Sequence, residues 1–127
     1  MKALVIDDSR AMRRIVGGIL RDLGYETVDA GNGQEALDAL DEHGPVDLAC
    51  IDWNMPVMDG LTFVTVMRAD RSRRDVTLMM VTTESEQSQI VRALAAGAHE
   101  YLIKPFTPDA IREKLEWLGL VPTGEYV

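Results

Sequence analysis

Four apolar residues followed by two acids, Ala3-Leu4-Val5-Ile6-Asp7-Asp8, give the first sign of the architecture of this chain. The apolar run is unbroken and contains β-branched residues, which is typical of a strand buried on both faces of a sheet. After it, apolar residues recur at the three- and four-residue spacing of one helical face: Met12, Ile15, Val16, Ile19, Leu20 and Leu23. This pattern predicts a buried strand followed by an amphipathic helix, with Ser9 as its N-cap and Gly24 as its C-cap.

The same strand and helix unit recurs along the chain. Further strands are predicted at residues 26–30, 48–51, 78–81 and 101–103, each followed by a helical pattern. Such alternation predicts an α/β fold of the flavodoxin-like (βα)5 type, a doubly wound, five-stranded parallel sheet covered by helices on both faces. We expect residues 1–120 to form one domain and residues 121–127 to form a short C-terminal tail.

The composition limits the class of protein. The chain has 127 residues, with 13 Lys and Arg against 21 Asp and Glu, so its formal net charge is −8. So acidic a chain would be repelled by nucleic-acid phosphates, and its apolar runs are too short to cross a bilayer. A single cysteine, Cys50, allows neither a disulfide framework nor a Cys-based zinc site. We therefore expect a cytoplasmic protein that binds neither nucleic acid nor membrane.

Polar side chains stand where the predicted strands end. Asp7 and Asp8 follow the first strand, and Asp52, Thr82 and Lys104 follow or end the third, fourth and fifth. In an open parallel sheet the carboxyl ends of the strands meet at one edge, where ligands bind. We therefore expect these five side chains to form one site.

Three carboxylates at one edge would repel one another. Each pair at about 4 Å costs on the order of 4 kcal/mol at an effective dielectric constant near 20. A divalent cation together with the Lys104 ammonium would neutralise them, and hard oxygen ligands favour Mg²⁺ or Mn²⁺. Protonation of one acid is the alternative. A carboxylate beside such a metal and a lysine can attack phosphorus and form an aspartyl phosphate.

Four separated motifs carry a resemblance to a known family. They are Asp7-Asp8, Asp52-Trp53-Asn54-Met55-Pro56-Val57-Met58-Asp59-Gly60, Val81-Thr82-Thr83-Glu84 and Tyr101-Leu102-Ile103-Lys104-Pro105-Phe106. In this order and spacing they resemble the receiver domain of response regulators, over essentially the whole chain. The Asp-Trp-Asn-Met-Pro form, the run Met12-Arg13-Arg14-Ile15-Val16 and Tyr101 are similar to the single-domain chemotaxis regulators of that family.

The resemblance implies a phosphoacceptor and a metal site. Asp52 would accept the phosphoryl group. Asp8, Asp52 and the main-chain carbonyl of Asn54 would ligate Mg²⁺ directly, and Asp7 would act through a bound water. Asn54 and Glu84, each two residues beyond a site residue, would modulate the lifetime of the phosphoryl group.

It also implies a switch. Lys104 and the Thr82 hydroxyl would bind the phosphoryl oxygens, and the Lys104-Pro105 bond is often cis in this family. As Thr82 moves toward the phosphoryl group, the Tyr101 ring would turn into the space behind it. The face formed by the fourth helix, the last strand and the fifth helix would then bind a partner.

The partners implied are a chemotaxis-type sensor histidine kinase that donates the phosphoryl group, a downstream protein such as the flagellar motor switch, and a phosphatase. The regulator itself is expected to be a monomer and not an enzyme. The fourth helix, where chemotaxis regulators present lysines, begins here with Glu86 and Gln87, and Trp117 lies on the fifth helix. This departure from the family pattern leaves two downstream targets open, the flagellar motor switch and another receiver-interacting protein.

Of two other functions, one remains open and the other is disfavoured. A phosphate sink or relay intermediate without motor output would carry the same motifs. An aspartyl-phosphate phosphatase is disfavoured, because haloacid-dehalogenase-like enzymes have an Asp-x-Asp pattern and a cap insertion, whereas Asp7 and Asp8 are adjacent.

For several charged residues we expect helix-capping or solvent-exposed positions. Asp59 precedes Gly60 and is expected to cap a helix rather than bind metal. Arg10, Arg13 and Arg14 either dock a kinase or face water. Solvated positions without metal-ligand spacing are expected for the remaining basic residues considered: Arg68, Arg71, Arg73, Arg74, His43 and His99.

Overall fold

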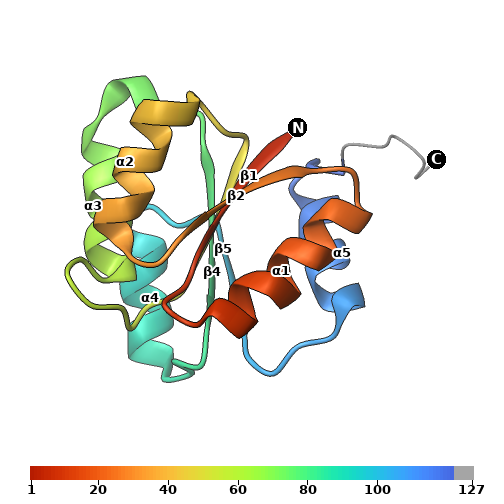
Figure 1. Cartoon of the computed structure of the whole chain (residues 1–127). Coiled ribbons are helices and arrows are strands. Elements are labelled where there is room, and N and C mark those ends of the chain that lie inside the picture. Colours follow the sequence, from red (N-terminus) through yellow and green to blue (C-terminus); the bar gives the residue numbers. More distant parts are fainter. Residues whose placement is uncertain (122–127) are drawn as a thin grey trace.

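Strands and helices alternate along residues 1–121, the part of the chain that the computed structural model describes (Figure 1). The strands are β1 (Lys2–Ile6), β2 (Glu26–Ala30), β3 (Leu48–Ile51), β4 (Thr77–Thr82) and β5 (Glu100–Ile103). The helices are α1 (Arg10–Asp22), α2 (Gly33–His43), α3 (Gly60–Ala69), the short 3₁₀ helix η1 (Arg71–Arg73), α4 (Gln87–Ala96) and α5 (Pro108–Trp117). Apart from Val121, the predicted tail lies outside the described residues. No helix within this range has the length and apolarity that a bilayer crossing requires.

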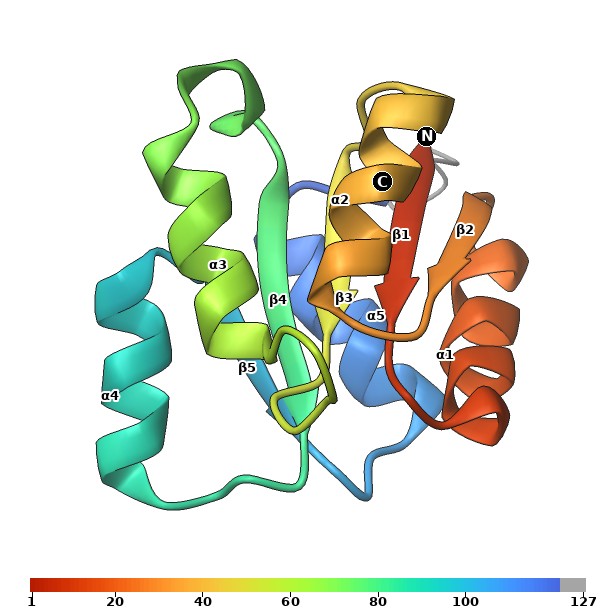
Figure 2. The same cartoon turned by 60° about the vertical axis from the view of Figure 1, so that its left-hand side comes forward.

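The strands form one parallel sheet in the order β2-β1-β3-β4-β5 (Figure 2). Helices α1 and α5 cover one face, and α2, α3 and α4 cover the other (Figure 1). The chain builds outward from β1 to β2 and then crosses to β3 on the other side of β1. The predicted doubly wound (βα)5 fold is therefore confirmed.

Successive residues of each central strand enter different cores. In β1, Leu4 and Ile6 pack on the side of α2, α3 and α4, whereas Ala3 and Val5 pack on the side of α1 and α5. All four are at most 1% exposed. Burial on both faces explains why the strand sequences are continuous apolar runs rather than alternating ones.

Side-chain caps fix where four helices begin. The caps are Ser9, Asn32, Asp59 and Thr107, and each accepts a hydrogen bond from a backbone N–H in the first turn that follows. Asp59 is thus the helix cap that the sequence predicts. Gly24, with φ of 102°, lies one residue beyond the Leu23 C-cap of α1.

Arg68, at the end of α3, joins two strand connections, one before β4 and one before β5, at the edge of the sheet remote from the strand carboxyl ends. Its guanidinium donates hydrogen bonds to the carbonyls of Gly97 at 2.9 Å, Arg74 at 3.0 Å and Val76 at 2.9 Å. It also lies 3.0 Å from Nδ1 of His99, which accepts the Leu78 backbone N–H. Burial and then the nearby Arg68 charge lower the pKa of His99, which favours the neutral ring that can accept.

The expectation that Arg68 is merely solvated is therefore wrong, whereas His99 is exposed as expected and also accepts a backbone hydrogen bond. Both pair with backbone groups that sequence spacing does not bring together, because they belong to different strand connections.

Arg68→Met is expected to lower the free energy of unfolding by roughly 2–4 kcal/mol, because three carbonyls lose a charged donor while the apolar stem remains. Arg71→Met is the matched control, since Arg71 is exposed and its side chain holds none of these carbonyls. Urea unfolding followed by circular dichroism measures both variants. Equal stability of the two would contradict a structural role for Arg68.

Candidate functional site

The sheet register places the acids side by side. Ile6 and Ile51 are paired between β1 and β3, so Asp7 and Asp52, the residues that follow them, leave the sheet at the same level. The Asp52 backbone N–H donates to the Ile6 carbonyl at 2.9 Å. This is the point at which the strand order reverses, where open α/β sheets bind ligands.

Asp7, Asp8 and Asp52 form a cluster of carboxylates. One oxygen from each lies within 4.8 Å of the others. Asp7 is buried and Asp8 is exposed, so the cluster opens toward solvent on one side. Three hard anionic oxygens converging from two strand ends are a donor set that fits Mg²⁺.

Lys104 supplies positive charge inside this cluster. Its ammonium lies 2.7 Å from Asp7 Oδ2 and 3.6 Å from Asp52 Oδ2, and its side chain is 12% exposed. The Lys104 backbone N–H donates to the Thr82 carbonyl at 2.9 Å, and the Lys104-Pro105 peptide bond is cis. With one ammonium against three carboxylates, the site has a formal charge of −2, which a divalent cation matches.

Burial is the main influence on the Asp52 carboxyl, and it raises the pKa of that group. The Lys104 charge and a hydrogen bond from the Thr82 hydroxyl act in the opposite direction, and Asp7 raises the pKa further. The Trp53 backbone N–H donates to Asp52 Oδ1 at 2.8 Å and so fixes the orientation of the carboxylate.

Asn54 and Glu84 meet across the mouth of the site. The Asn54 side-chain amide donates to Glu84 Oε1 at 2.9 Å, which links the loop after β3 to the loop after β4. The Glu84 backbone N–H donates to Thr82 Oγ1 at 3.3 Å, and Thr82 is fully buried. The two residues expected to modulate phosphoryl lifetime therefore lie together, although their roles stay predictions.

Tyr101 connects this loop to β5. Its ring is 7% exposed, and its hydroxyl donates to the Glu84 carbonyl at 2.7 Å. Burial, followed by the charges of Glu84 and Asp52, raises the pKa of the phenol, so it stays a donor at neutral pH. The ring already occupies a buried position in this structure, and its expected movement on phosphorylation stays a prediction.

Two residues that the sequence analysis did not assign to the site also shape it, and Arg13 neither faces water nor is free to dock a partner. Arg13 on α1 donates to the Asp7 main-chain carbonyl at 2.6 Å and lies 3.6 Å from Asp29 Oδ2. Gly60 begins α3 directly against the main chain of Asp52, and a Cβ there would lie far inside the 3.0 Å that real Cβ contacts keep. The Asp-Gly pair at 59–60 signalled a helix start, but the close approach depends on the tertiary fold.

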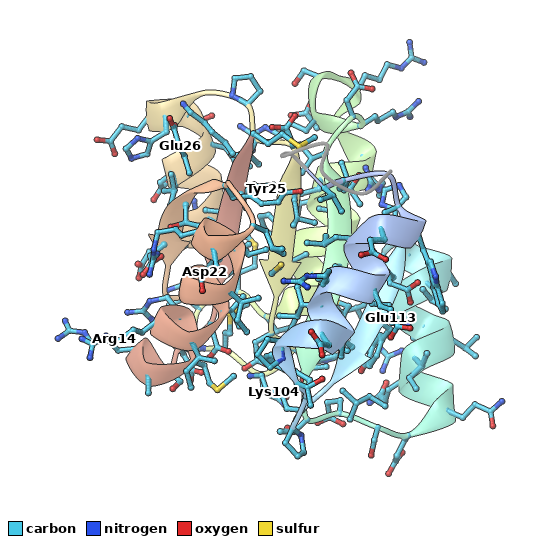
Figure 3. The ribbon with its side chains drawn as sticks, turned by 90° about the vertical axis from the view of Figure 1, so that its right-hand side faces the viewer. Arg14, Asp22, Tyr25, Glu26, Lys104 and Glu113 are labelled. Carbon is cyan, nitrogen blue, oxygen red and sulfur yellow. The ribbon has the colours of Figure 1, made fainter. Side chains whose placement is uncertain are left out.

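A groove of about 510 Å³ lies beside Lys104. It is lined by Met12, Ile15, Thr83, Lys104, Pro105 and Phe106. Figure 3 shows Lys104 at this end of the molecule, below α1 and α5.

Comparison with known proteins agrees with this geometry. Residues 3–116 match the response regulator receiver domain. The chain is 45% identical to chemotaxis protein CheY1 of Helicobacter pylori strain J99, over 91% of this chain and 94% of that protein. It is also 45% identical to the chemotaxis protein CheY homolog of Campylobacter jejuni strain 81-176, over 98% of this chain and 97% of that protein. The crystal structure of Vibrio cholerae CheY4 at low pH superimposes with a TM-score of 0.84 at 35% identity, covering 91% of this chain and 96% of that one.

Proposed function

Because the chain belongs to the response regulator receiver domain family, we propose that it is a single-domain regulator that accepts a phosphoryl group on Asp52 from the phosphohistidine of a chemotaxis-type sensor kinase. The observation that carries the proposal is the half-buried Asp52 carboxylate, held by the Trp53 N–H and facing Lys104 beside two further acids. The family is one of signalling domains rather than of classical enzymes, so the phosphatase alternative is set aside.

The transfer needs little from the protein beyond position and charge. An Asp52 oxygen forms the new O–P bond while the P–N bond to the donor imidazole breaks, and the imidazole nitrogen leaves with the electron pair. Lys104, 3.6 Å from Asp52 Oδ2, would move onto a phosphoryl oxygen, and the Thr82 hydroxyl would donate to another. The apolar groove around Ile15 and Phe106 would hold part of the donor protein's surface beside Lys104.

Asp8, Asp52 and the Asn54 main-chain carbonyl would hold Mg²⁺ directly, with Asp7 acting through water. When bound, the ion would supply charge neutralisation for the carboxylates and for the incoming phosphoryl oxygens. Asp7 is less available than Asp8 because its carboxylate is buried and already paired with Lys104 at 2.7 Å.

Hydrolysis would end the signal, and the Asn54–Glu84 pair stands where an attacking water would enter. Their hydrogen bond closes the gap between the two loops. We infer that this pair sets the lifetime of the aspartyl phosphate, with or without a separate phosphatase.

The output would be binding of a protein partner by the face of α4, β5 and α5, in the cytoplasm. Four large apolar side chains on these elements are exposed: Val91, Leu94, Ile103 and Trp117. Exposed apolar groups favour a partner-binding role over that of a phosphate sink. The target would be the flagellar motor switch or another protein that binds receiver domains.

Incubation with acetyl phosphate and Mg²⁺, followed by intact mass measurement, tests the phosphoacceptor role. The wild type is expected to gain one phosphoryl group, because acetate is a good leaving group and the site supplies the remaining charge. Borohydride reduction, which converts an aspartyl phosphate to homoserine, should then mark residue 52 in the peptide map. Marking of another residue, or no mass gain with Mg²⁺ present, would refute the proposal.

The metal assignment has its own test by calorimetric titration with Mg²⁺. Asp8→Ala is expected to weaken Mg²⁺ binding at least about tenfold, since even outer-shell partners of metals contribute that much. Asp59→Ala is the control, because Asp59 Oδ1 accepts the Thr62 N–H as a helix cap. Equal losses in both variants would place the metal elsewhere.

A further inference from the structure

Four arginines surround a hollow of about 410 Å³ between α1 and β2, next to the acid cluster but separate from its carboxylates. Its lining consists of Arg10, Arg13, Arg14, Arg21 and Asp29. Figure 3 shows Arg14 extending from α1 away from the ribbon. No apolar or aromatic side chain takes part in this lining.

The charge of the hollow is opposite to that of the protein. Four guanidiniums and one carboxylate give it +3, whereas the whole chain carries −8, so the remaining residues sum to −11. Arg10, Arg13 and Arg14 also lie in the first five residues of α1, whose first turn holds no acid. Cations are unfavourable at this end of a helix, because the N-terminal end of the dipole is itself positive. An anion in the hollow would offset the repulsion among the arginines and the repulsion between the arginines and the helix dipole.

Two of the arginines are fixed by the fold and two are free. Arg13 donates to the Asp7 carbonyl, although its buried Nε has no hydrogen-bond partner, and Arg21 donates to Thr27 Oγ1 at 2.8 Å. Among residues 1–121, neither Arg10 nor Arg14 has a hydrogen bond or an ion pair. These two lie four residues apart on one helix face, so they can hold two anionic groups.

Helix α1 also carries two interior glycines, of which Gly17 lies directly beneath the Arg21 side chain that lines the hollow. A Cβ at Gly17 would lie 2.9 Å from Nη1 of Arg21, and one at Gly18 would lie 3.9 Å from Nη2. Glycine lowers helix stability at interior positions. At Gly17 its absence of a side chain lets Arg21 fold back along the helix toward the other arginines.

We propose that this hollow binds a compact diphosphate group, either as inorganic pyrophosphate or as part of a nucleoside diphosphate. Guanidiniums bind phosphate oxygens in pairs, and +3 matches the charge of a diphosphate at neutral pH. At physiological salt, charges more than about 8 Å apart are largely screened from one another. A small anion in the hollow therefore interacts more strongly with the arginines than with the acidic remainder of the protein. A long polyanion would reach beyond the hollow and meet that remainder.

Titration calorimetry of the full chain with pyrophosphate, at physiological ionic strength and without Mg²⁺, tests this proposal independently of phosphorylation. Arg14→Gln is expected to weaken binding about tenfold, the loss of one charge-assisted contact. Arg71→Gln removes the same charge from the exposed η1 helix at the other end of the sheet and should bind as the wild type does. Gly17→Ala should bind more weakly yet melt at a higher temperature, which separates binding from folding.

A parallel titration with ADP distinguishes the sources of the diphosphate. Equal affinity assigns recognition to the diphosphate alone, and tighter binding assigns it to a nucleotide. The proposal is overturned if pyrophosphate does not bind, if Arg71→Gln weakens binding as much as Arg14→Gln, or if a Glu-rich peptide binds as tightly as pyrophosphate.

Discussion

The Asp52→Asn protein is expected to gain no phosphoryl group from acetyl phosphate and Mg²⁺, and to melt at a higher temperature than the wild type. The first result follows because an amide is too poor a nucleophile to form the O–P bond. Asp59→Asn is the matched control: Asn can cap α3 as Asp does, and labelling should be retained. Intact mass after incubation measures the first result, and thermal unfolding without Mg²⁺ or acetyl phosphate measures the second.

The second result follows from the sign of the pKa shift. Burial raises the pKa of Asp52, so the folded protein binds that proton more tightly than the unfolded chain does. The stability gained in this way is present below the ordinary carboxyl pKa and is lost as the pH rises through the raised value. At neutral pH the wild type thus bears the cost of a buried charge that asparagine removes.

The difference in melting temperature should accordingly shrink as the pH is lowered. A variant that melts below the wild type at neutral pH would show that pairing of Asp52 with Lys104 outweighs its burial. A variant that still gained a phosphoryl group would show that another residue is the acceptor.

Gly60→Ala is expected to lower the rate of labelling by about 100-fold, the scale expected when a reacting group is displaced by about 1 Å. A Cβ at Gly60 would overlap the Asp52 carbonyl oxygen and lie 3.1 Å from Ile51 Cγ2. The Gly60 N–H also donates to the Trp53 carbonyl at 2.8 Å, so α3 cannot move away without breaking the loop that orients Asp52.

Gly18→Ala is the control, because the nearest atom to its Cβ lies 3.9 Å away on a flexible arginine. That variant should label at the wild-type rate. Time courses of mass gain compare the two proteins, and circular dichroism confirms that Gly60→Ala is folded. A folded Gly60→Ala protein that labels normally would mean that the α3 start does not position Asp52.

The positions of the strands could be predicted from the sequence, because strands buried on both faces are short apolar runs ending in polar residues. Leu48–Ile51 was placed to the residue, whereas β4 extends to Thr77 and Thr82. Those threonines are not apolar, and only their pairing with Leu48 and Ile103 reveals them as strand residues. The η1 helix is too short for its sequence to show an apolar periodicity.

The composition of the site was also predictable, because parallel strands deliver their following residues to one edge. Which of these side chains form ion pairs and hydrogen bonds with one another was not predictable. That Lys104 lies nearer Asp7 than Asp52, or that Tyr101 bonds the Glu84 carbonyl, depends on side-chain directions set by packing. Arg68 shows the limit most clearly, since its three carbonyl partners come from two separate connections.

The division of the interior by the sheet has a consequence for engineering this protein. Leu20 of α1 and Phe63 of α3 are both fully buried, but they belong to clusters on opposite faces. Because such positions belong to separate clusters, the energetic effects of substitutions there are expected to add to within about 0.5 kcal/mol. The α1 and α5 half can therefore be made more thermostable by combining mutations chosen one at a time, without retuning the half that carries α3 and the Tyr101 ring.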